Sequence, residues 1–369
     1  MLSFRYKLDF DQESPPFFYG LTVGAIFFMI SRKHCLFSLP LLLTSSLLGF
    51  GCVAIAKPLA KSPGFSGTIG VNAAVSDSQS QFTIDDDNEQ TDDLNNAGES
   101  ITTGFAFPFF RLAYTSDDLK TQYFLGQSTE NILDSAIQYE IGVTHQFDKR
   151  QSMTLAYVPH VPFLKETWSD PFLTNAPRKK SDIDSSAVRI AYKFMPIKVE
   201  YAYASYSIED EQSGSQNTAC NGQICTAEEQ ASLERDSDYQ RLSLESSIRL
   251  WQGSFLKANV FYADQDAKGD SQSFDEWHYS LSIMTKFDAH FLSLQAAFSD
   301  RKYDAENPIF GDVQQDNMAR YSLFYSYAKP FNIEDSSLNI IYQNKDIDAN
   351  IDFYDSTSSF VSVGMSYNF

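Results

Sequence analysis

The chain has 369 residues, a formal net charge of −20 and 15% aromatic residues, with 28 Lys and Arg against 48 Asp and Glu. This length permits one large domain or two ordinary ones. Beyond residue 60 the apolar residues rarely recur at the 3.6-residue spacing of an amphipathic helix, which argues against a helical fold. No Gly-rich phosphate loop or nucleic-acid motif is present, so we expect no nucleic-acid partner.

The amino-terminal segment has the parts of an export signal. Arg32 and Lys33 precede a long apolar run that ends in small residues at Ala56. A basic region, an apolar region and a small-x-small site are the features of a secretory signal peptide. We therefore expect residues 1–56 to be an upstream extension and a signal peptide, and residues 57–369 to form the mature protein. An uncleaved membrane anchor and a lipoprotein site are the alternatives.

The rest of the chain alternates between apolar and polar residues in segments of about ten to thirteen residues. Segments of this length are typical of a transmembrane β-barrel, whose tilted strands need about 9–11 residues to cross the hydrocarbon. Fourteen segments are expected, at 65–75, 101–115, 119–128, 135–147, 151–160, 182–194, 197–208, 238–250, 254–265, 274–287, 290–302, 316–329, 336–347 and 358–369.

The connections between these segments alternate in length. Short links begin at residues 116, 148, 195, 251, 288 and 330. Longer links lie between them, at 76–100, 161–181, 209–237, 266–273, 303–315 and 348–357, and only 129–134 is brief. Bacterial outer-membrane barrels have short periplasmic turns, long outer loops and an even number of strands. The fold class predicted is therefore an all-β, antiparallel, up-and-down transmembrane barrel of about fourteen strands in the bacterial outer membrane.

One face of the expected strands carries no charge. Its side chains include Ile69/Val71/Ala73/Val75, Ile137/Tyr139/Ile141/Val143, Val188/Ile190/Tyr192/Phe194, Leu242/Leu244/Ile248/Leu250, Trp277/Tyr279/Leu281/Ile283 and Tyr321/Leu323/Tyr325/Tyr327. Aromatic residues stand at both ends of most of these sets, where membrane interfaces favour amphipathic rings. A soluble β-sandwich also alternates, but it has little reason to place aromatic residues in this way. We expect this face to contact outer-membrane lipid and lipopolysaccharide.

The last strand ends on an aromatic carboxyl-terminal residue, with Tyr367 and Phe369 on its apolar face. A closing strand removes the open sheet edge that lipid does not tolerate. The aromatic end resembles the carboxyl-terminal signal by which the barrel-insertion machinery recognises outer-membrane proteins.

Four stretches resemble an uncharacterised family of gammaproteobacterial outer-membrane proteins. They are "PGFSG" at 63–67, "YFLGQSTENIL" at 123–133, "WSDPFLTNAPRKKSD" at 168–182 and "LERDSDY" at 233–239. The resemblance covers essentially the whole mature chain. It implies a barrel fold without an established activity, and it brings no catalytic residues.

The inner face is predicted to be basic although the chain is acidic. Its expected cations are Arg111, Arg189, Lys193, Lys198, Arg241, Arg249, Lys257, Lys286, Arg320 and Lys345, and its expected acids are Glu140, Glu200 and Glu245. Rings of basic side chains favour anions in a pore. One hypothesis is a lumen that passes small anionic solutes. The alternative is that the acids pair with these bases and hold a packed interior together.

Two cysteines follow residue 56. Cys220 and Cys225 lie in "CNGQIC", and an exported chain meets an oxidising compartment, so we expect a disulfide rather than a zinc site. The bridge would stiffen the loop at 209–237, which either narrows the mouth or shields the surface. The acidic run at 85–93 lacks the spacing of a calcium loop and is interpreted as a solvated, flexible loop.

No catalytic site is predicted. The histidines His145, His160, His278 and His290 are scattered, and no G-x-S-x-G motif is present. The sequence favours a passive, porin-like channel for small solutes, with anionic solutes as one hypothesis, and without a cofactor or a metal. A surface structural or interaction barrel with a plugged lumen is the second hypothesis, and an outer-membrane hydrolase is the third. The oligomeric state is left open.

Overall fold

The computed structural model describes residues 58–128, 138–160, 165–215, 220 and 222–369. All of them belong to one compact unit that spans residues 52–369. The predicted signal peptide and its cleavage site lie outside the described residues.

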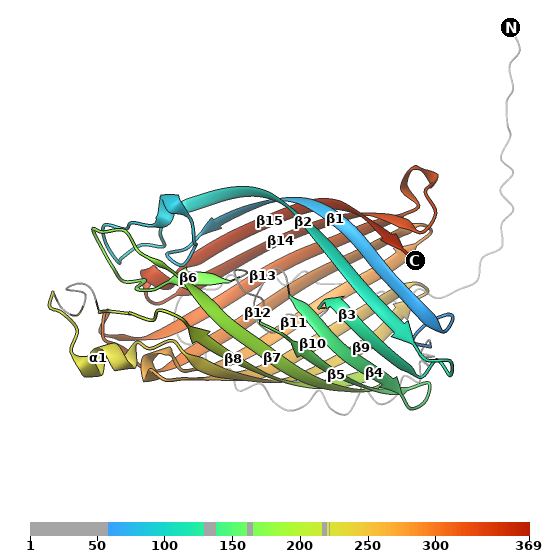
Figure 1. Ribbon diagram of the computed structural model, residues 1–369, viewed down its shortest axis with the longest axis horizontal. Helices are drawn as coiled ribbons and strands as arrows, with labels where there is room; N and C mark the ends of the chain where they lie inside the picture. The colour runs from blue at the N-terminus through green and yellow to red at the C-terminus, as the bar shows by residue number, and fades with distance from the viewer. Residues whose placement is uncertain (1–57, 129–137, 161–164, 216–219, 221) are drawn as a thin grey trace, which may run out of the picture. The chain divides into compact units, whose positions relative to one another are not determined.

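Most of the described chain is one antiparallel sheet (Figure 1). Its strands are β1 (Gly64–Gln79), β2 (Ser100–Thr115), β3 (Thr121–Gln127), β4 (Tyr139–Gln146), β5 (Gln151–Val158), β6 (Glu166–Trp168), β7 (Lys180–Phe194), β8 (Ile197–Ile208), β9 (Ser237–Trp251), β10 (Ser254–Ala267), β11 (Phe274–Phe287), β12 (His290–Asn307), β13 (Asp312–Ala328), β14 (Ser336–Ala349) and β15 (Ser356–Asn368). Helix α1 (Ala227–Ser232) and the 3-10 turns η1 (Asp86–Asn88), η2 (Asp270–Gln272), η3 (Pro330–Asn332) and η4 (Asp352–Tyr354) lie in the connections.

The sheet closes on itself. Consecutive strands pair with each other, β1 pairs with β15, and β5 pairs with β7. The short strand β6 only extends the outer end of β7, so that fourteen strands form the wall. The predicted fourteen-stranded barrel is confirmed, and β8 and β11 begin and end at the predicted residues.

The predicted bounds of the other strands differ from the observed ones, most of all at the outer ends of β12, β13 and β1. The expected long link at 303–315 is mostly strand, because β12 and β13 continue to the pairs Glu306–Val313 and Asn307–Asp312. Strand β1 likewise continues to Gln79, beyond the predicted end at residue 75. Both extensions are mostly polar, so the two-residue alternation is weak there although the strands stay paired, with a register shift between Lys302 and Glu306.

The outward face suits hydrocarbon. Leu244 and Leu281 keep 48% and 49% of their surface exposed, as expected for side chains that face lipid. At the outer rim, the hydroxyl of Tyr203 donates to Asp238 at 2.7 Å, so an aromatic ring reaches from the apolar band to a hydrated carboxylate. None of the described helices is long and apolar enough to cross a bilayer.

The carboxyl-terminal residue seals the join between the first and last strands. The amide of Phe369 donates to the carbonyl of Gly67 at 3.0 Å, and the Gly67 amide donates back at 2.9 Å. A Cβ on Gly67 would lie 2.6 Å from the Phe369 ring and 2.9 Å from the carbonyl oxygen of Arg111, so a larger residue would displace the ring or strain the sheet. This contact gives a physical reason for the glycine that ends "PGFSG".

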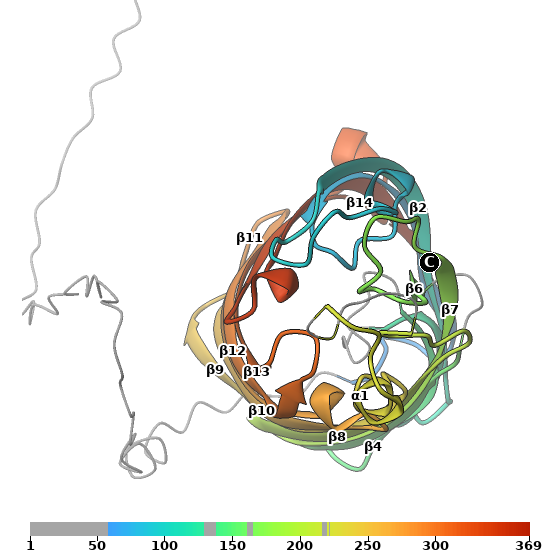
Figure 2. The same cartoon turned by 90° about the vertical axis from the view of Figure 1, so that its left-hand side faces the viewer.

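The outer loops form a lid over one end of the barrel. Phe172, Leu233, Ile351 and Phe353 are buried together, and Phe82, Leu94, Ile309, Phe310 and Tyr354 pack around them. These residues come from the loops at 80–99, 159–179, 209–236, 308–311 and 350–355. Viewed along the barrel, loops lie across the mouth, inside the ring of strands (Figure 2). Burial of each large apolar side chain stabilises this lid by about 1.5–3 kcal/mol.

A charge on the outward face tests the membrane assignment. We expect Leu281→Arg, near the middle of β11, to reduce the free energy of unfolding by about 2–4 kcal/mol, because the guanidinium would lie in hydrocarbon. Urea unfolding of protein refolded into lipid vesicles measures the change. Leu281→Ala removes the same side chain without adding a charge and should lose less. Equal losses in the two variants would contradict a lipid-facing position.

Candidate functional site

A row of charged side chains runs around much of the inner wall, in two parts that are offset by two residues between β4 and β7. From β7 to β13 the paired residues are Arg189, Ala202, Arg241, Ala263, Glu276, Arg301 and Asp316. From β2 to β4 they are Arg111, Gly126 and Glu140. We call the charged members of this row, with Lys198 and Glu200, the charged belt.

Glu140 joins the two parts of the belt. Its side chain has no exposed surface, and it accepts from Arg189 Nε at 3.0 Å and Arg189 Nη2 at 3.1 Å. Arg111 Nη1 donates to the same carboxylate at 3.2 Å, and Ser128 donates at 3.0 Å. A carboxylate withdrawn from water is stable only with such compensation, so Glu140 depends on both arginines.

Glu200 has a similar role on β8. It accepts from Arg189 at 3.2 Å, from Arg241 at 3.1 Å and from Lys198 at 3.4 Å. The connected group of Arg111, Glu140, Arg189, Lys198, Glu200 and Arg241 therefore contains four cations and two carboxylates, a surplus of two positive charges. Pairing reduces the positive charge of this wall without cancelling it.

Small residues make room for the long charged ones. Ala202 and Ala263 alternate with Arg189, Arg241 and Glu276 along the row and are themselves completely buried. On β3 the same place is taken by Gly126, whose φ is +140°. A Cβ there would lie 2.3 Å from the carbonyl oxygen of Phe110, so a larger residue would strain the sheet.

The predicted lumen residues fall into three groups. Arg189, Lys198 and Arg241 belong to the belt with Glu140 and Glu200, and Lys257 pairs with Glu245 at 3.2 Å. Lys193 and Arg249 lie exposed near the periplasmic ends of β7 and β9. Arg320 lies apart from the belt, on the wall of an internal cavity.

This cavity has a volume of about 690 Å³ and extends along the inner faces of β8–β14. Its charged lining consists of five bases, Arg241, Lys257, Arg301, Arg320 and Lys345, and three acids, Glu245, Glu276 and Asp316. Arg301 pairs with Glu276 at 2.9 Å. The prediction omitted Glu276, Arg301 and Asp316, although the two-residue alternation would have placed all three inward.

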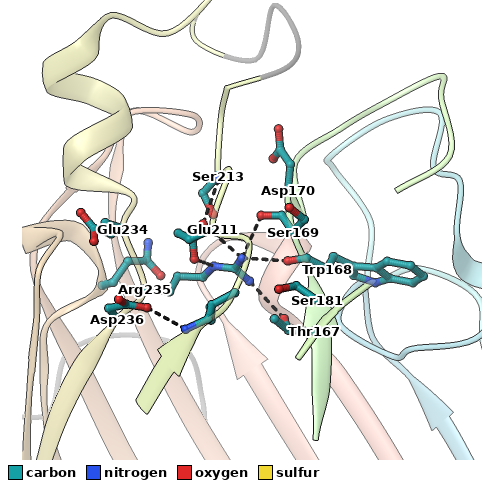
Figure 3. Close-up of polar contacts among 12 residues, drawn as sticks. Thr167, Trp168, Ser169, Asp170, Ser181, Glu211, Ser213, Glu234, Arg235 and Asp236 are labelled. Atoms are coloured by element: carbon teal, nitrogen blue, oxygen red, sulfur yellow. Dashed lines mark hydrogen bonds and ion pairs between the residues drawn. The ribbon is translucent and has the colours of Figure 1, made fainter. Parts of the chain in front are cut away.

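Arg235 holds the lid together from below (Figure 3). Its guanidinium donates to Glu211 at 2.8 Å and to Thr167 at 3.1 Å. It also donates to the carbonyls of Trp168 and Ser169, at 2.7 and 3.1 Å. One side chain thereby joins the two ends of the loop at 209–236 to each other and to residues 167–169, and each charge-assisted bond is stronger than a neutral one.

Arg178 makes a second joint in the lid. Its guanidinium is buried over the Trp168 ring, 4.7 Å from the centroid, and donates to the Gln81 carbonyl at 3.0 Å. It also donates to the carbonyl of Asn88. Burial lowers the pKa of Arg178 to about 10. The motif "WSDPFLTNAPRKKSD" supplies Trp168, Phe172 and Arg178 to the lid, and "LERDSDY" supplies Leu233 and Arg235.

The remaining predicted loop features also lie in this region. Cys220 and Cys225 are joined by a disulfide next to α1. The acidic run at 85–93 is not simply a solvated, flexible loop: Asn88 is buried, and its amide donates to the Thr83 carbonyl at 2.8 Å. The neighbouring Asp86 pairs with Lys180 at 2.9 Å.

The histidines occupy separate places. His145 is hydrogen-bonded to the Thr121 hydroxyl, and His290 is hydrogen-bonded to the Tyr325 hydroxyl. His160 lies 3.2 Å from the Asp184 carboxylate. His278 stacks on Phe261 inside the cavity, with ring centroids 4.3 Å apart. Within the described ranges, no three His, Cys, Asp or Glu side chains are grouped so as to hold a metal ion.

A closed barrel with an uncharged apolar exterior and a charged interior is a bacterial outer-membrane β-barrel, and its outward face contacts lipid. The chain belongs to the family described as "Protein of unknown function (DUF2860)", whose model matches residues 64–368. No curated protein matches the sequence.

Several solved outer-membrane proteins are similar at low identity. An anion-selective porin from Comamonas acidovorans is 10% identical with a TM-score of 0.40, covering 84% of this chain and 99% of that one. A Pseudomonas aeruginosa FadL homologue is 12% identical with a TM-score of 0.41, covering 86% and 95%. OmpT of Vibrio cholerae is 11% identical with a TM-score of 0.38, covering 84% and 99%. Similarities this low carry no argument about the solute.

The belt makes a prediction about stability. We expect Glu140→Gln to lower the free energy of unfolding by about 3 kcal/mol, because Arg111 and the buried Arg189 lose the carboxylate charge that they share and Arg189 keeps only Glu200. Urea unfolding in lipid vesicles, followed by tryptophan fluorescence, measures this loss. Glu245→Gln is the matched control: its pair with Lys257 is partly exposed, and the change should be about 0–1 kcal/mol. A loss as small for Glu140→Gln as for the control would contradict a structural role for the belt.

Proposed function

We propose that this outer-membrane barrel is a passive channel for small anionic solutes. The observation that carries the proposal is the cavity of about 690 Å³ inside the barrel, whose lining has five bases and three acids. A low-dielectric wall focuses the field of such a surplus on a permeating ion, which favours anions. The surplus of two positive charges in the connected group around Glu140 and Glu200 acts in the same direction.

The ion pairs give the belt a structural task as well. Arg189, Lys198 and Arg241 are bound to carboxylates and are not mobile ligands for a solute. We therefore assign anion preference to the field of the whole wall and to the cavity, rather than to these three side chains. No catalytic step is part of the proposal, since the four histidines are engaged in separate places.

The lid supports a second candidate, a structural or interaction barrel with a closed outer mouth. Five loops share one buried apolar cluster, and Arg178 and Arg235 join neighbouring loops by hydrogen bonds. A channel of this build conducts only if solutes pass around the lid or if the lid opens. The two candidates are therefore separated by conductance.

The carboxyl-terminal aromatic residues belong to the proposal for assembly. We propose that the barrel-insertion machinery recognises Tyr367 and Phe369 as a carboxyl-terminal signal. What supports this role is that both side chains face outward, with about half of their surface exposed, at the seam between β1 and β15.

Charge selectivity tests the channel. We expect single channels of the refolded protein in a planar bilayer to prefer chloride under a KCl gradient, as read from the reversal potential. Lys257→Gln should weaken this preference and Glu245→Gln should strengthen it, because the two changes remove opposite charges from one lumen pair. Preference for potassium in the unsubstituted protein would overturn the anion assignment.

The lid makes a separate prediction. We expect Arg235→Ala to raise single-channel conductance, because it removes the bonds that join β9 to Glu211 and to residues 167–169. Lys268→Ala is the matched control: its ion pairs to Glu234 and Asp236 lie at the surface, with 62% of the lysine side chain exposed, and conductance should not change. Silence of the unsubstituted protein and of Arg235→Ala would favour the closed barrel.

A further inference from the structure

Two cations face each other on the inner wall, away from the belt. Arg320 on β13 and Lys345 on β14 are directly paired in register, and both line the cavity. Like charges placed directly opposite on one sheet face repel each other, so the pair is destabilising by itself. An anion between the two side chains would convert this repulsion into two attractions.

Two acids of the cavity wall lie beside Arg301. Glu276 pairs with Arg301 at 2.9 Å, and Asp316 lies opposite Arg301 in the register of β12 and β13. Asp316 also accepts from Gln314 at 2.9 Å. The buried Nε of Arg320 has no hydrogen-bond partner among the described residues. A buried guanidinium nitrogen without an acceptor is unfavourable, and a ligand oxygen would satisfy it.

A cluster of aromatic rings borders this pair. Phe360 on β15 lies two residues from Ser358, which faces Lys345. The Phe360 ring is 6.3 Å from that of Phe105 and 6.4 Å from that of Phe107, on β2. All three rings point inward, since they share the face of the buried Ala74 and Asn72. Phe105 nevertheless keeps 37% of its surface exposed, so this aromatic shelf lies open to the lumen.

We propose that Arg320, Lys345 and the aromatic shelf form a binding site for a small aromatic carboxylate. The carboxylate accepts from the two cations, and a guanidinium can hold it through two parallel bonds. The ring then lies on Phe360, next to Phe105 and Phe107, where offset or edge-to-face contacts are favourable. The two ends of the site are diagonal neighbours on one sheet face, about 7–8 Å apart, which one substituted ring spans.

This site deepens the proposed function, because it names the class of anion that the lumen would take. The charge pair alone would accept any small anion, and the shelf alone would accept any small apolar molecule. Their combination selects a molecule that carries both. A binding site in a channel must also release its solute, so weak binding is expected.

Calorimetric titration of the refolded protein in detergent tests the site without requiring conductance. The probes are sodium benzoate, sodium acetate and benzyl alcohol. We expect benzoate to bind at least about tenfold more tightly than either of the others, since acetate lacks the ring and benzyl alcohol lacks the charge. Equal affinities for benzoate and acetate, or for benzoate and benzyl alcohol, would overturn the proposal.

Variants assign the two halves of the site. We expect Phe360→Ser to weaken benzoate binding by about tenfold and to leave acetate unchanged. Arg320→Gln should weaken both carboxylates, and Lys345→Gln provides a second test of the charge pair. Phe324→Ser, an inward aromatic residue outside the shelf, is the control and should leave benzoate binding unchanged. Unfolding curves in the same detergent verify that each variant is folded.

The outcomes separate this inference from the channel proposal. Benzoate binding that depends on Arg320 and Phe360, in a protein that conducts no chloride, would retain the site and remove the channel. Chloride conductance without selective benzoate binding would retain the channel and remove the site.

Discussion

Hydrocarbon offers no hydrogen-bond partner to a peptide group, and this one constraint determines the rest of the molecule. The twelve paired positions between β1 and β15, from Thr68–Asn368 to Gln79–Thr357, leave no open edge for lipid to meet. The bonds between Gly67 and Phe369 complete the seam at its periplasmic end. Once the sheet is closed, each residue in the wall has only two directions, toward lipid or toward the lumen.

The charged side chains of the wall point toward the lumen, away from lipid. They are stabilised by ion pairs in which each carboxylate contacts more than one cation. Two buried carboxylates, Glu140 and Glu200, form ion pairs with four cations. The buried Ala202 and Ala263, which alternate with the charged residues of the row, leave space for the long side chains. The same arrangement leaves a positive surplus. Structural support and an electrostatic preference for anions therefore come from one set of residues.

Sequence patterns were informative where the two faces differ in polarity. Strands β8 and β11 have the predicted bounds, because outward apolar residues, such as Tyr201 in β8 and Leu281 in β11, alternate with inward polar or small residues along the strand. The pattern failed at 303–315, where most residues are polar and the strand pairing continues beyond the apolar band. Alternation also placed Arg189 and Glu140 on the inner face. It could not predict that the two side chains meet, since the register between strands depends on turns and on pairings far apart in the chain.

The lid was beyond prediction for a related reason. Phe172, Leu233 and Phe353 are far apart in the sequence and carry no periodic signal in their loops. Only the closed barrel brings them together above one mouth. The motifs at 168–182 and 233–239 marked the segments, and the structure supplies the reason: they contain the two arginines and part of the apolar cluster.

Surface loops of barrels are ordinarily free to change length and composition one at a time, because each is supported by its own hairpin. Here the five loops at 80–99, 159–179, 209–236, 308–311 and 350–355 share a single apolar cluster. An insertion in one of these loops disturbs a cluster to which the other four loops also contribute side chains. Sequence change in these loops is thus restricted to matched sets of substitutions, and grafting a foreign epitope into one loop disturbs the entire outer face.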